Sequence, residues 1–178
     1  MPKYLEKPKV IYQSNRFDIH TQDVMLDTGK VFHMEYMNHP GAAAILPLFD
    51  DDTVVMIRNE RYAVSENLWE LPAGTLEVGE PPLETARREL VEETGYSASD
   101  IKEYMRFYTS PGVCNELMYA YVARDLKLEE QNLDESETIS VHLLPMKKVM
   151  EMVRDGEITD GKTVTMLMYY ELFHEALR

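Results

Sequence analysis

Three glutamates crowd one short stretch of the chain, Arg88-Glu89-Leu90-Val91-Glu92-Glu93. On a helix with about 100° per residue, Glu89 and Glu93 project side by side, and Glu92 lies one step further round. Like charges at these spacings repel and cost about a few tenths of a kcal/mol per pair. A hard divalent cation offsets that cost, because Mg²⁺ binds carboxylate oxygens and keeps waters and phosphate oxygens as its other ligands.

The same stretch has a plainer interpretation as a solvated acidic helix face. Arg88 stands one turn before Glu92, where it can hold that carboxylate in an ion pair. For an isolated acidic helix this interpretation would be preferred. The residues before the helix favour the metal site instead.

A helix is expected from Pro81 or Pro82 to Thr94. Proline suits the first turn of a helix, and Gly95 stands where a C-terminal glycine belongs. One stripe of this helix is suited to packing on the core, and the two glutamates lie beside it. The stripe consists of Leu83, Ala86, Leu90 and Thr94.

The other elements give a mixed α/β chain. Short alternating stretches in the first forty residues predict a small antiparallel meander. Residues 41–50 and 53–62 predict two strands of a hairpin around an acidic turn, and 68–74 a strand that runs into a loop. Further strands are expected at 102–110, 116–126 and 138–145, and helices at 146–156 and 160–177.

Composition limits the classes of partner. The chain has 178 residues, 44% of them hydrophobic, and a formal charge of −14. This predicts one catalytic domain, residues 41–178, after an N-terminal extension, residues 1–40. The negative field disfavours nucleic acid and anionic membranes. The single Cys114 and the lack of an eighteen-residue apolar run predict a cytoplasmic protein that does not span a membrane.

The segment from Gly74 to Gly95 resembles the Nudix hydrolases. It meets the fixed positions of that family's box at the family's spacing, and Tyr96 alone departs, standing where an aliphatic residue is preferred. The matching positions are Gly74, Glu80, Arg88, Glu89, Leu90, Glu92, Glu93 and Gly95. The resemblance implies an α/β/α sandwich with a mixed sheet that hydrolyses a nucleoside diphosphate linked to another group.

Two further features are similar to the ADP-ribose pyrophosphatase branch of the family. Residues 69–74, WELPAG, stand directly before the box, and Pro111 follows Gly95 by sixteen residues. A Pro-Gly pair also suits an ordinary type II turn, which leaves Pro111 a second interpretation. The resemblance covers residues 42–178. The first forty residues match in kind, as a strand-rich extension that builds a dimer in this branch, often by exchange.

The resemblance also implies roles for single residues. It puts Glu89, Glu93 and the carbonyl of Ala73 on Mg²⁺, with Mn²⁺ as an alternative, and Glu92 close enough to share in binding. Glu92 and Arg88 are expected to belong to the catalytic set. In the acidic loop 134–137, Glu135 is expected to be the general base and Glu137 an outer metal ligand, although most such loops are solvated tips. No covalent intermediate is required.

Substrate contacts are expected at a second set of positions. Arg61 stands where the branch binds the diphosphate, and Arg58 is its alternative. Glu70 is expected to contact the nucleotide or the terminal ribose. The base should stack on an aromatic ring of the extension, and four are available: Tyr12, Phe17, Phe32 and Tyr36.

The predicted function is hydrolysis of a nucleoside diphosphate sugar, with ADP-ribose, cleaved to AMP and ribose 5-phosphate, the leading substrate. Another sugar nucleotide such as GDP-mannose is the alternative within the fold, since the box leaves base and sugar open. A nucleotide-sensing module without turnover is the alternative of another class. The intact set of box carboxylates disfavours it, because a sensor needs no complete metal site.

Overall fold

The chain forms two compact units in the computed structural model, which describes residues 3–14, 17–133 and 137–173. One unit comprises Met1–Gly41 and Tyr108–Leu117, and the other Ala42–Phe107 and Met118–Arg178. Each unit is built around its own strands.

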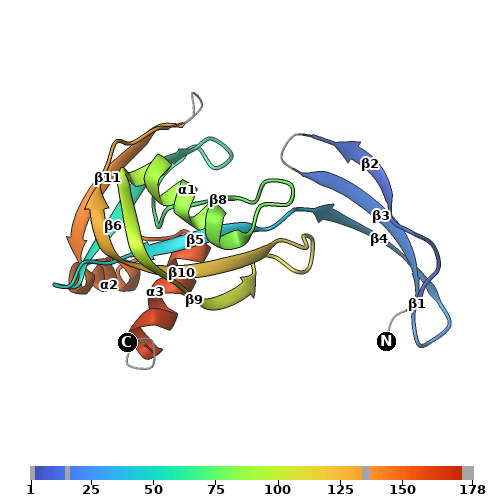
Figure 1. The fold of residues 1–178 in the computed structure, drawn as a ribbon. Helices are drawn as coiled ribbons and strands as arrows, with labels where there is room; N and C mark the ends of the chain where they lie inside the picture. The colour runs from blue at the N-terminus through green and yellow to red at the C-terminus, as the bar shows by residue number, and fades with distance from the viewer. Residues whose placement is uncertain (1–2, 15–16, 134–136, 174–178) are drawn as a thin grey trace. The chain divides into compact units, whose positions relative to one another are not determined.

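The first unit is an antiparallel sheet (Figure 1). Its strands are β1 (Lys3–Tyr4), β2 (Lys9–Gln13), β3 (Asp18–Met25) and β4 (Val31–Asn38). The central strand β3 pairs with β4 along one edge and with β2 and β1 along the other, all antiparallel. The expected meander of β2, β3 and β4 is therefore confirmed, and β1 is an additional strand that the sequence did not indicate.

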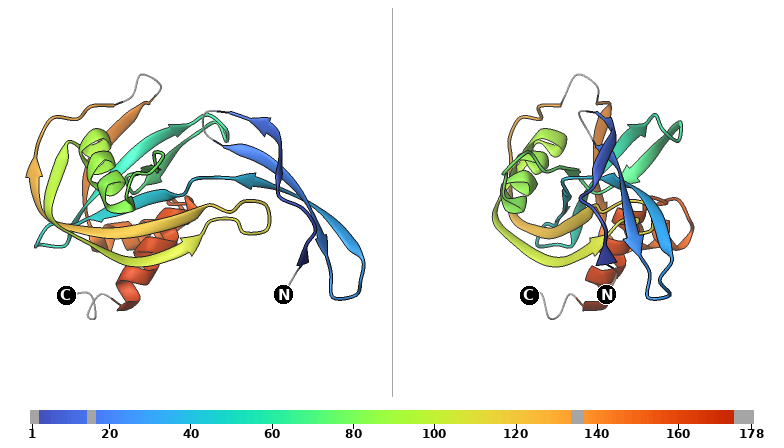
Figure 2. Two further views of the ribbon diagram at one scale, coloured as in Figure 1. Left: turned by 45° about the vertical axis from the view of Figure 1, so that its right-hand side comes forward. Right: turned by 90° about the vertical axis from the view of Figure 1, so that its right-hand side faces the viewer.

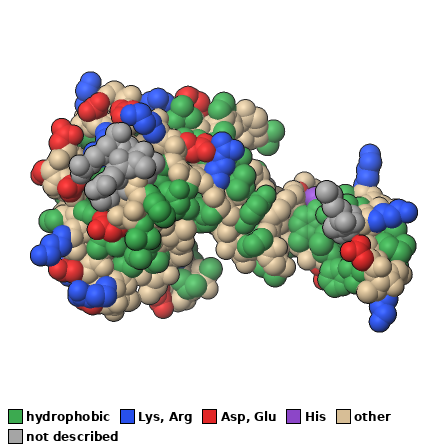
Figure 3. Space-filling model, turned by 90° about the horizontal axis from the view of Figure 1, so that it is seen from below, with side chains coloured by type: hydrophobic (Ala, Val, Ile, Leu, Met, Phe, Trp, Pro, Cys, Tyr) green, Lys and Arg blue, Asp and Glu red, His purple; other side chains and the backbone are tan. Residues whose placement is uncertain are grey.

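Much of this sheet's apolar surface is exposed within its unit. Figure 3 shows hydrophobic side chains, in green, gathered over the β1–β4 sheet. The large apolar residues exposed here are Tyr4, Leu5, Val10, Ile11, Tyr12, Leu26, Val31 and Phe32. A sheet that leaves such residues in water gains little stability from burial.

The described residues of the second unit form two sheets and three helices. The strands are β5 (Ala42–Pro47), β6 (Thr53–Arg61), β7 (Glu66–Glu70), β8 (Ala73–Thr75), β9 (Tyr96–Tyr108), β10 (Leu117–Leu128) and β11 (Ile139–Pro145). They form one sheet in the order β8-β5-β10-β9 and another in the order β11-β6-β7. The helices are α1 (Pro82–Thr94), α2 (Met146–Arg154) and α3 (Gly161–Phe173). In the described ranges no helix is long and apolar enough to cross a membrane.

The predicted hairpin of residues 41–50 and 53–62 is wrong in its pairing. Both strands exist, but β5 pairs parallel with β10, and β6 pairs with β7 and β11 in the other sheet. A single bridge, Leu48 to Val54, joins the two segments. The reason is that every residue of β5 is buried, as in a central strand covered on both faces. Strand β9 also begins earlier than expected, at Tyr96 rather than Lys102.

Strand β5 is covered by helices on both faces (Figure 2). Ala43 and Ile45 point to the α1 side, where they pack with Ala86 and Leu90. The alternate residues, Ala44 and Leu46, belong to the core that α2 and α3 complete with Val149, Met166 and Leu167. This confirms the expected α/β/α layering, and it fixes α1 against the sheet.

Candidate active site

Helix α1 carries the two glutamates at the edge of its buried face. The helix begins after Pro81, and it ends at Gly95, whose left-handed φ of 68° glycine adopts without strain. Glu89 is 8% exposed and Glu93 2% exposed, beside the core residues Ala86 and Leu90. Packing of α1 on β5 therefore takes both carboxylates largely out of water.

The backbone of β8 runs directly against these carboxylates. The Ala73 amide donates a hydrogen bond of 2.8 Å to Glu93. At the next residue, Gly74, an added Cβ would lie 1.8 Å from Oε1 of Glu89, so any larger residue there would displace the Glu89 carboxylate from this position. This close approach gives Gly74 of the box a physical role, and it brings Ala73, Glu89 and Glu93 together as expected.

Arg88 holds the outer carboxylates of the box. Its Nη1 donates to Glu89 at 2.7 Å and to Glu92 at 3.0 Å, which is the predicted ion pair and one more. Its Nε and Nη2 donate to the two oxygens of Glu80, each at 3.2 Å. Arg88 thereby lowers the pKa of Glu80 to about 2, and Thr85 adds a hydrogen bond of 2.8 Å to the same carboxylate. Sequence reasoning assigned no task to Glu80, which here fixes Arg88 from the loop before the helix.

Burial raises the pKa of Glu89 to about 7, against the lowering effect of Arg88. Burial also raises the pKa of Glu93 to about 8, against the hydrogen bond from Ala73. The negative charge of Glu137 raises both pKa values further. Glu137 is therefore electrostatically close to both glutamates, and its role as an outer metal ligand stays a prediction. Glu135 lies outside the described residues.

The donor chemistry of this cluster fits a hard divalent cation. Two buried carboxylates with raised pKa values and a third nearby are oxygen donors whose negative charge the chain only partly neutralises. Within residues 3–14, 17–133 and 137–173, however, no three acidic, histidine or cysteine side chains converge closely enough for a metal. Glu89 and Glu93 instead bind Arg88 and the Ala73 amide.

Arg61 at the end of β6 and Glu70 at the end of β7 form an ion pair in the β11-β6-β7 sheet. Nε and Nη2 of Arg61 donate to the two oxygens of Glu70, each at 2.7 Å. Lys162 at the start of α3 binds the same carboxylate. Glu70 is 1% exposed, so its oxygens serve Arg61 and Lys162, and its expected contact with the substrate stays a prediction. Arg58 is occupied elsewhere, over the Trp69 ring and against Asn67.

Sequence reasoning missed Lys162. The signal that was present is a lysine beside Asp160 in the first turn of the helix expected at 160–177.

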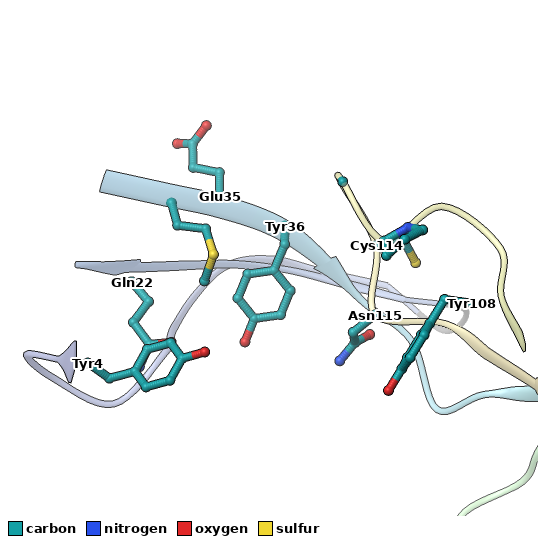
Figure 4. A pocket seen from close by; sticks show the side chains of 10 residues that line it. Tyr4, Gln22, Glu35, Tyr36, Tyr108, Cys114 and Asn115 are labelled. Atoms are coloured by element: carbon teal, nitrogen blue, oxygen red, sulfur yellow. The ribbon is translucent and has the colours of Figure 1, made fainter. Parts of the chain in front are cut away.

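Pro111 belongs to the first unit, where it lines a hollow of about 370 Å³ (Figure 4). Tyr36 and Tyr108 turn their rings into this hollow near Asn115, and Glu35 points to the other side of β4. Of the four aromatic residues expected to stack on a base, Tyr36 alone is among its lining residues. Tyr12 and Phe32 are more than half exposed.

The NUDIX domain family model matches residues 37–166 of the chain. The chain belongs to this family. The matched range contains α1 with both buried glutamates, β8 and the Arg61–Glu70 pair.

Curated relatives cover nearly the whole chain. It is 36% identical to an ADP-ribose pyrophosphatase of Bacillus subtilis (strain 168), over 94% of this chain and 91% of that protein. It is 34% identical to a methanol dehydrogenase activator of Bacillus methanolicus, over 97% and 94%. It is also 34% identical to a GDP-mannose pyrophosphatase of Escherichia coli O1:K1 / APEC, over 96% and 95%.

The fold is shared with a solved structure described as an ADP compounds hydrolase. The TM-score is 0.84 at 24% sequence identity, and the match covers 99% of this chain and 95% of the other. At this identity the likeness supports the fold.

The raised pKa values predict that stability depends on both pH and metal. A glutamate whose pKa rises on folding stabilises the fold while protonated, and this contribution is lost as pH rises through the folded value. We expect the free energy of unfolding, measured in urea with EDTA, to fall as pH rises from about 5 to about 9. Addition of Mg²⁺ should reduce the loss at the alkaline end.

Glu93→Gln is the control for this measurement. The variant keeps the shape of the side chain but cannot ionise, so its stability should fall less between the same pH values. Equal pH dependence in the two proteins would show that Glu93 does not titrate in this way.

Proposed function

We propose that the chain hydrolyses the diphosphate bond of nucleoside diphosphate sugars with the help of Mg²⁺, and that ADP-ribose is the preferred substrate. The observation that carries the proposal is the pair Glu89 and Glu93, buried beside the β8 backbone with raised pKa values. Membership of the NUDIX family and the named activities of two relatives support the reaction class. Water adds to one phosphorus, the bridging P–O bond breaks, and ADP-ribose gives AMP and ribose 5-phosphate.

The metal would be held by Glu89, Glu93 and the carbonyl of Ala73, with Glu137 as an outer ligand and Mn²⁺ as the alternative ion. When bound, it neutralises diphosphate charge and lowers the pKa of a coordinated water. Glu92 lies beside this set. Arg88 orients Glu89 and Glu92 through the hydrogen bonds described above.

The chain's own groups supply binding and proton transfer. Arg61, whose side chain is 43% exposed, offers a guanidinium to the diphosphate, and Pro111 is proposed as a substrate contact. Glu135 is proposed to accept the proton of the attacking water. An anionic substrate needs such local cations, because the chain carries a net charge of −14.

GDP-mannose is the alternative substrate, which the relative of that activity supports. Turnover of either sugar nucleotide would disfavour a sensing module. A cytoplasmic location, together with the division into an extension and a catalytic domain, stays a prediction.

The first experiment measures phosphate release in the presence of a phosphatase that attacks only the products. The panel contains ADP-ribose, GDP-mannose, UDP-glucose, diadenosine polyphosphates and nucleoside triphosphates, each with Mg²⁺. We expect ADP-ribose to have the highest kcat/KM and Glu93→Gln to lose most of it. Glu84→Gln is the matched control, because Glu84 is on the same helix with a 60% exposed side chain. If the native protein released no phosphate from any compound of the panel, the proposal would be contradicted.

The proposed base is tested by Glu135→Gln. Loss of a general base typically lowers turnover by about 10²–10⁴-fold, so kcat should fall by that range while KM and the unfolding midpoint change little. Glu130→Gln, an exposed neighbour in the chain, should leave kcat unchanged. Near-normal turnover in Glu135→Gln would end its candidacy.

We also propose that the chain is a homodimer, and the exposed apolar residues of the β1–β4 sheet support this. Sedimentation equilibrium should give twice the chain mass of 20.7 kDa. A paired substitution of two exposed apolar residues, Val10→Lys with Phe32→Lys, should shift the mass toward one chain, and a native protein of single-chain mass would refute the proposal.

A further inference from the structure

A row of four charged side chains, each paired with the next, connects the start of α3 to Arg61. Arg61 pairs with Glu70, Glu70 binds Lys162, and the Lys162 ammonium lies 3.0 Å from Asp160. The side chains of the two inner members are the most buried: exposure is 43% for Arg61, 1% for Glu70, 12% for Lys162 and 18% for Asp160. The four charges alternate in sign and sum to zero, so these side chains neutralise one another without an outside ion.

Glu70 is held by both of its oxygens. Oε1 accepts from Nε of Arg61, and Oε2 accepts from Nη2 of Arg61 and from Lys162. A bidentate pair of this kind sets the plane of the guanidinium only as firmly as the carboxylate itself is fixed. Lys162 is the second cation that stops the carboxylate from turning, and it shares the cost of burying the charge.

The position of Lys162 is in turn fixed by the first turn of α3. Asp160 accepts the Thr163 amide at 3.0 Å, as a helix N-cap does, and also binds the Lys162 ammonium. The hydroxyl of Thr163 accepts the Leu71 amide at 2.9 Å. Successive residues of α3 thus hold the successive residues Glu70 and Leu71, two positions before the Ala73 amide that binds Glu93.

A lysine at this place could bind phosphate directly or position Glu70, and its contacts favour the positioning role. A lysine that binds phosphate directly needs exposure and free donors. Lys162 is 12% exposed, and both of its contacts are carboxylates. Arg61, by contrast, uses Nε and Nη2 for Glu70, and its Nη1 makes no hydrogen bond within the part of the chain that the structure describes, so Nη1 can donate to an anion.

We propose that Lys162 is a positioning residue that fixes Glu70 and, through Glu70, the guanidinium of Arg61 that faces the diphosphate. The proposal rests on the function proposed above. Under this proposal, Glu70 supports Arg61. The first turn of α3 then influences substrate binding indirectly, without contacting the substrate.

The test is a double-mutant cycle in the full-length protein with ADP-ribose. Lys162→Met removes the charge and keeps the length of the side chain. We expect KM to rise by about tenfold with a smaller change in kcat, and Arg61→Gln to raise KM at least as much. In the Arg61→Gln background, Lys162→Met should change KM by less than about twofold, because the group through which it acts is absent.

Calorimetry of ADP-ribose in EDTA gives a readout that does not need turnover, and Kd should rise by the same factor as KM. Lys148→Met, an exposed lysine of α2, is the matched control and should leave both constants unchanged. An unchanged KM in Lys162→Met, or equal losses in both backgrounds, would overturn the proposal, the second outcome indicating direct phosphate contact or general damage.

A milder variant is used for the same test if Lys162→Met does not fold. Asp160→Asn keeps an N-cap acceptor for Thr163 and removes the charge that anchors Lys162. It should raise KM by about threefold in the native background and not in Arg61→Gln, and an unchanged KM would overturn the proposal. A native protein that neither cleaves nor binds the panel refutes the proposed function itself, whereas an active native protein with an unaffected variant refutes only the role of Lys162.

Discussion

Desolvation of Glu89 and Glu93 is the constraint on which the rest of the second unit depends. Burial makes the charged form of each carboxyl group costly and raises both pKa values, to about 7 and about 8. The sandwich places them there because α1 must bury Ala86 and Leu90 against β5, and the glutamates flank that stripe. Ionisation of both carboxyl groups at this site is therefore unfavourable, and a bound divalent cation would offset that cost.

Two groups of charged residues organise the surroundings of this pair in different ways. On one side, Arg88 binds Glu80, Glu89 and Glu92, and Gly74 leaves room for the Glu89 carboxylate. On the other, the sequence from Arg61 through Glu70 and Lys162 to Asp160 alternates in sign. The first group leaves excess negative charge, suited to a cation, and the second is neutral and ends in a half-exposed arginine, suited to an anion.

The local chemistry of α1 was predictable because it depends on neighbours in sequence. Helix periodicity put Glu89 and Glu93 side by side, proline and glycine marked its ends, and the Arg88–Glu92 pair follows from a spacing of four. The fold class was also predictable, from the succession of alternating and helical stretches. The partner of β5 was not, because a fully buried strand has the same apolar run whichever strand lies beside it.

The sequence by itself determined which carboxylates stand on one helix face, where that helix begins and ends, and which residue types could bind a metal and a diphosphate. Only the tertiary structure decided that Glu70 holds Arg61, that Lys162 reaches it from 92 positions along the chain, and that Gly74 lies against Glu89. The physical reason is the distance in sequence between the interacting residues. Hydrogen bonds within a helix turn are set by local spacing, whereas the pairing of buried charges depends on which elements the core brings into contact.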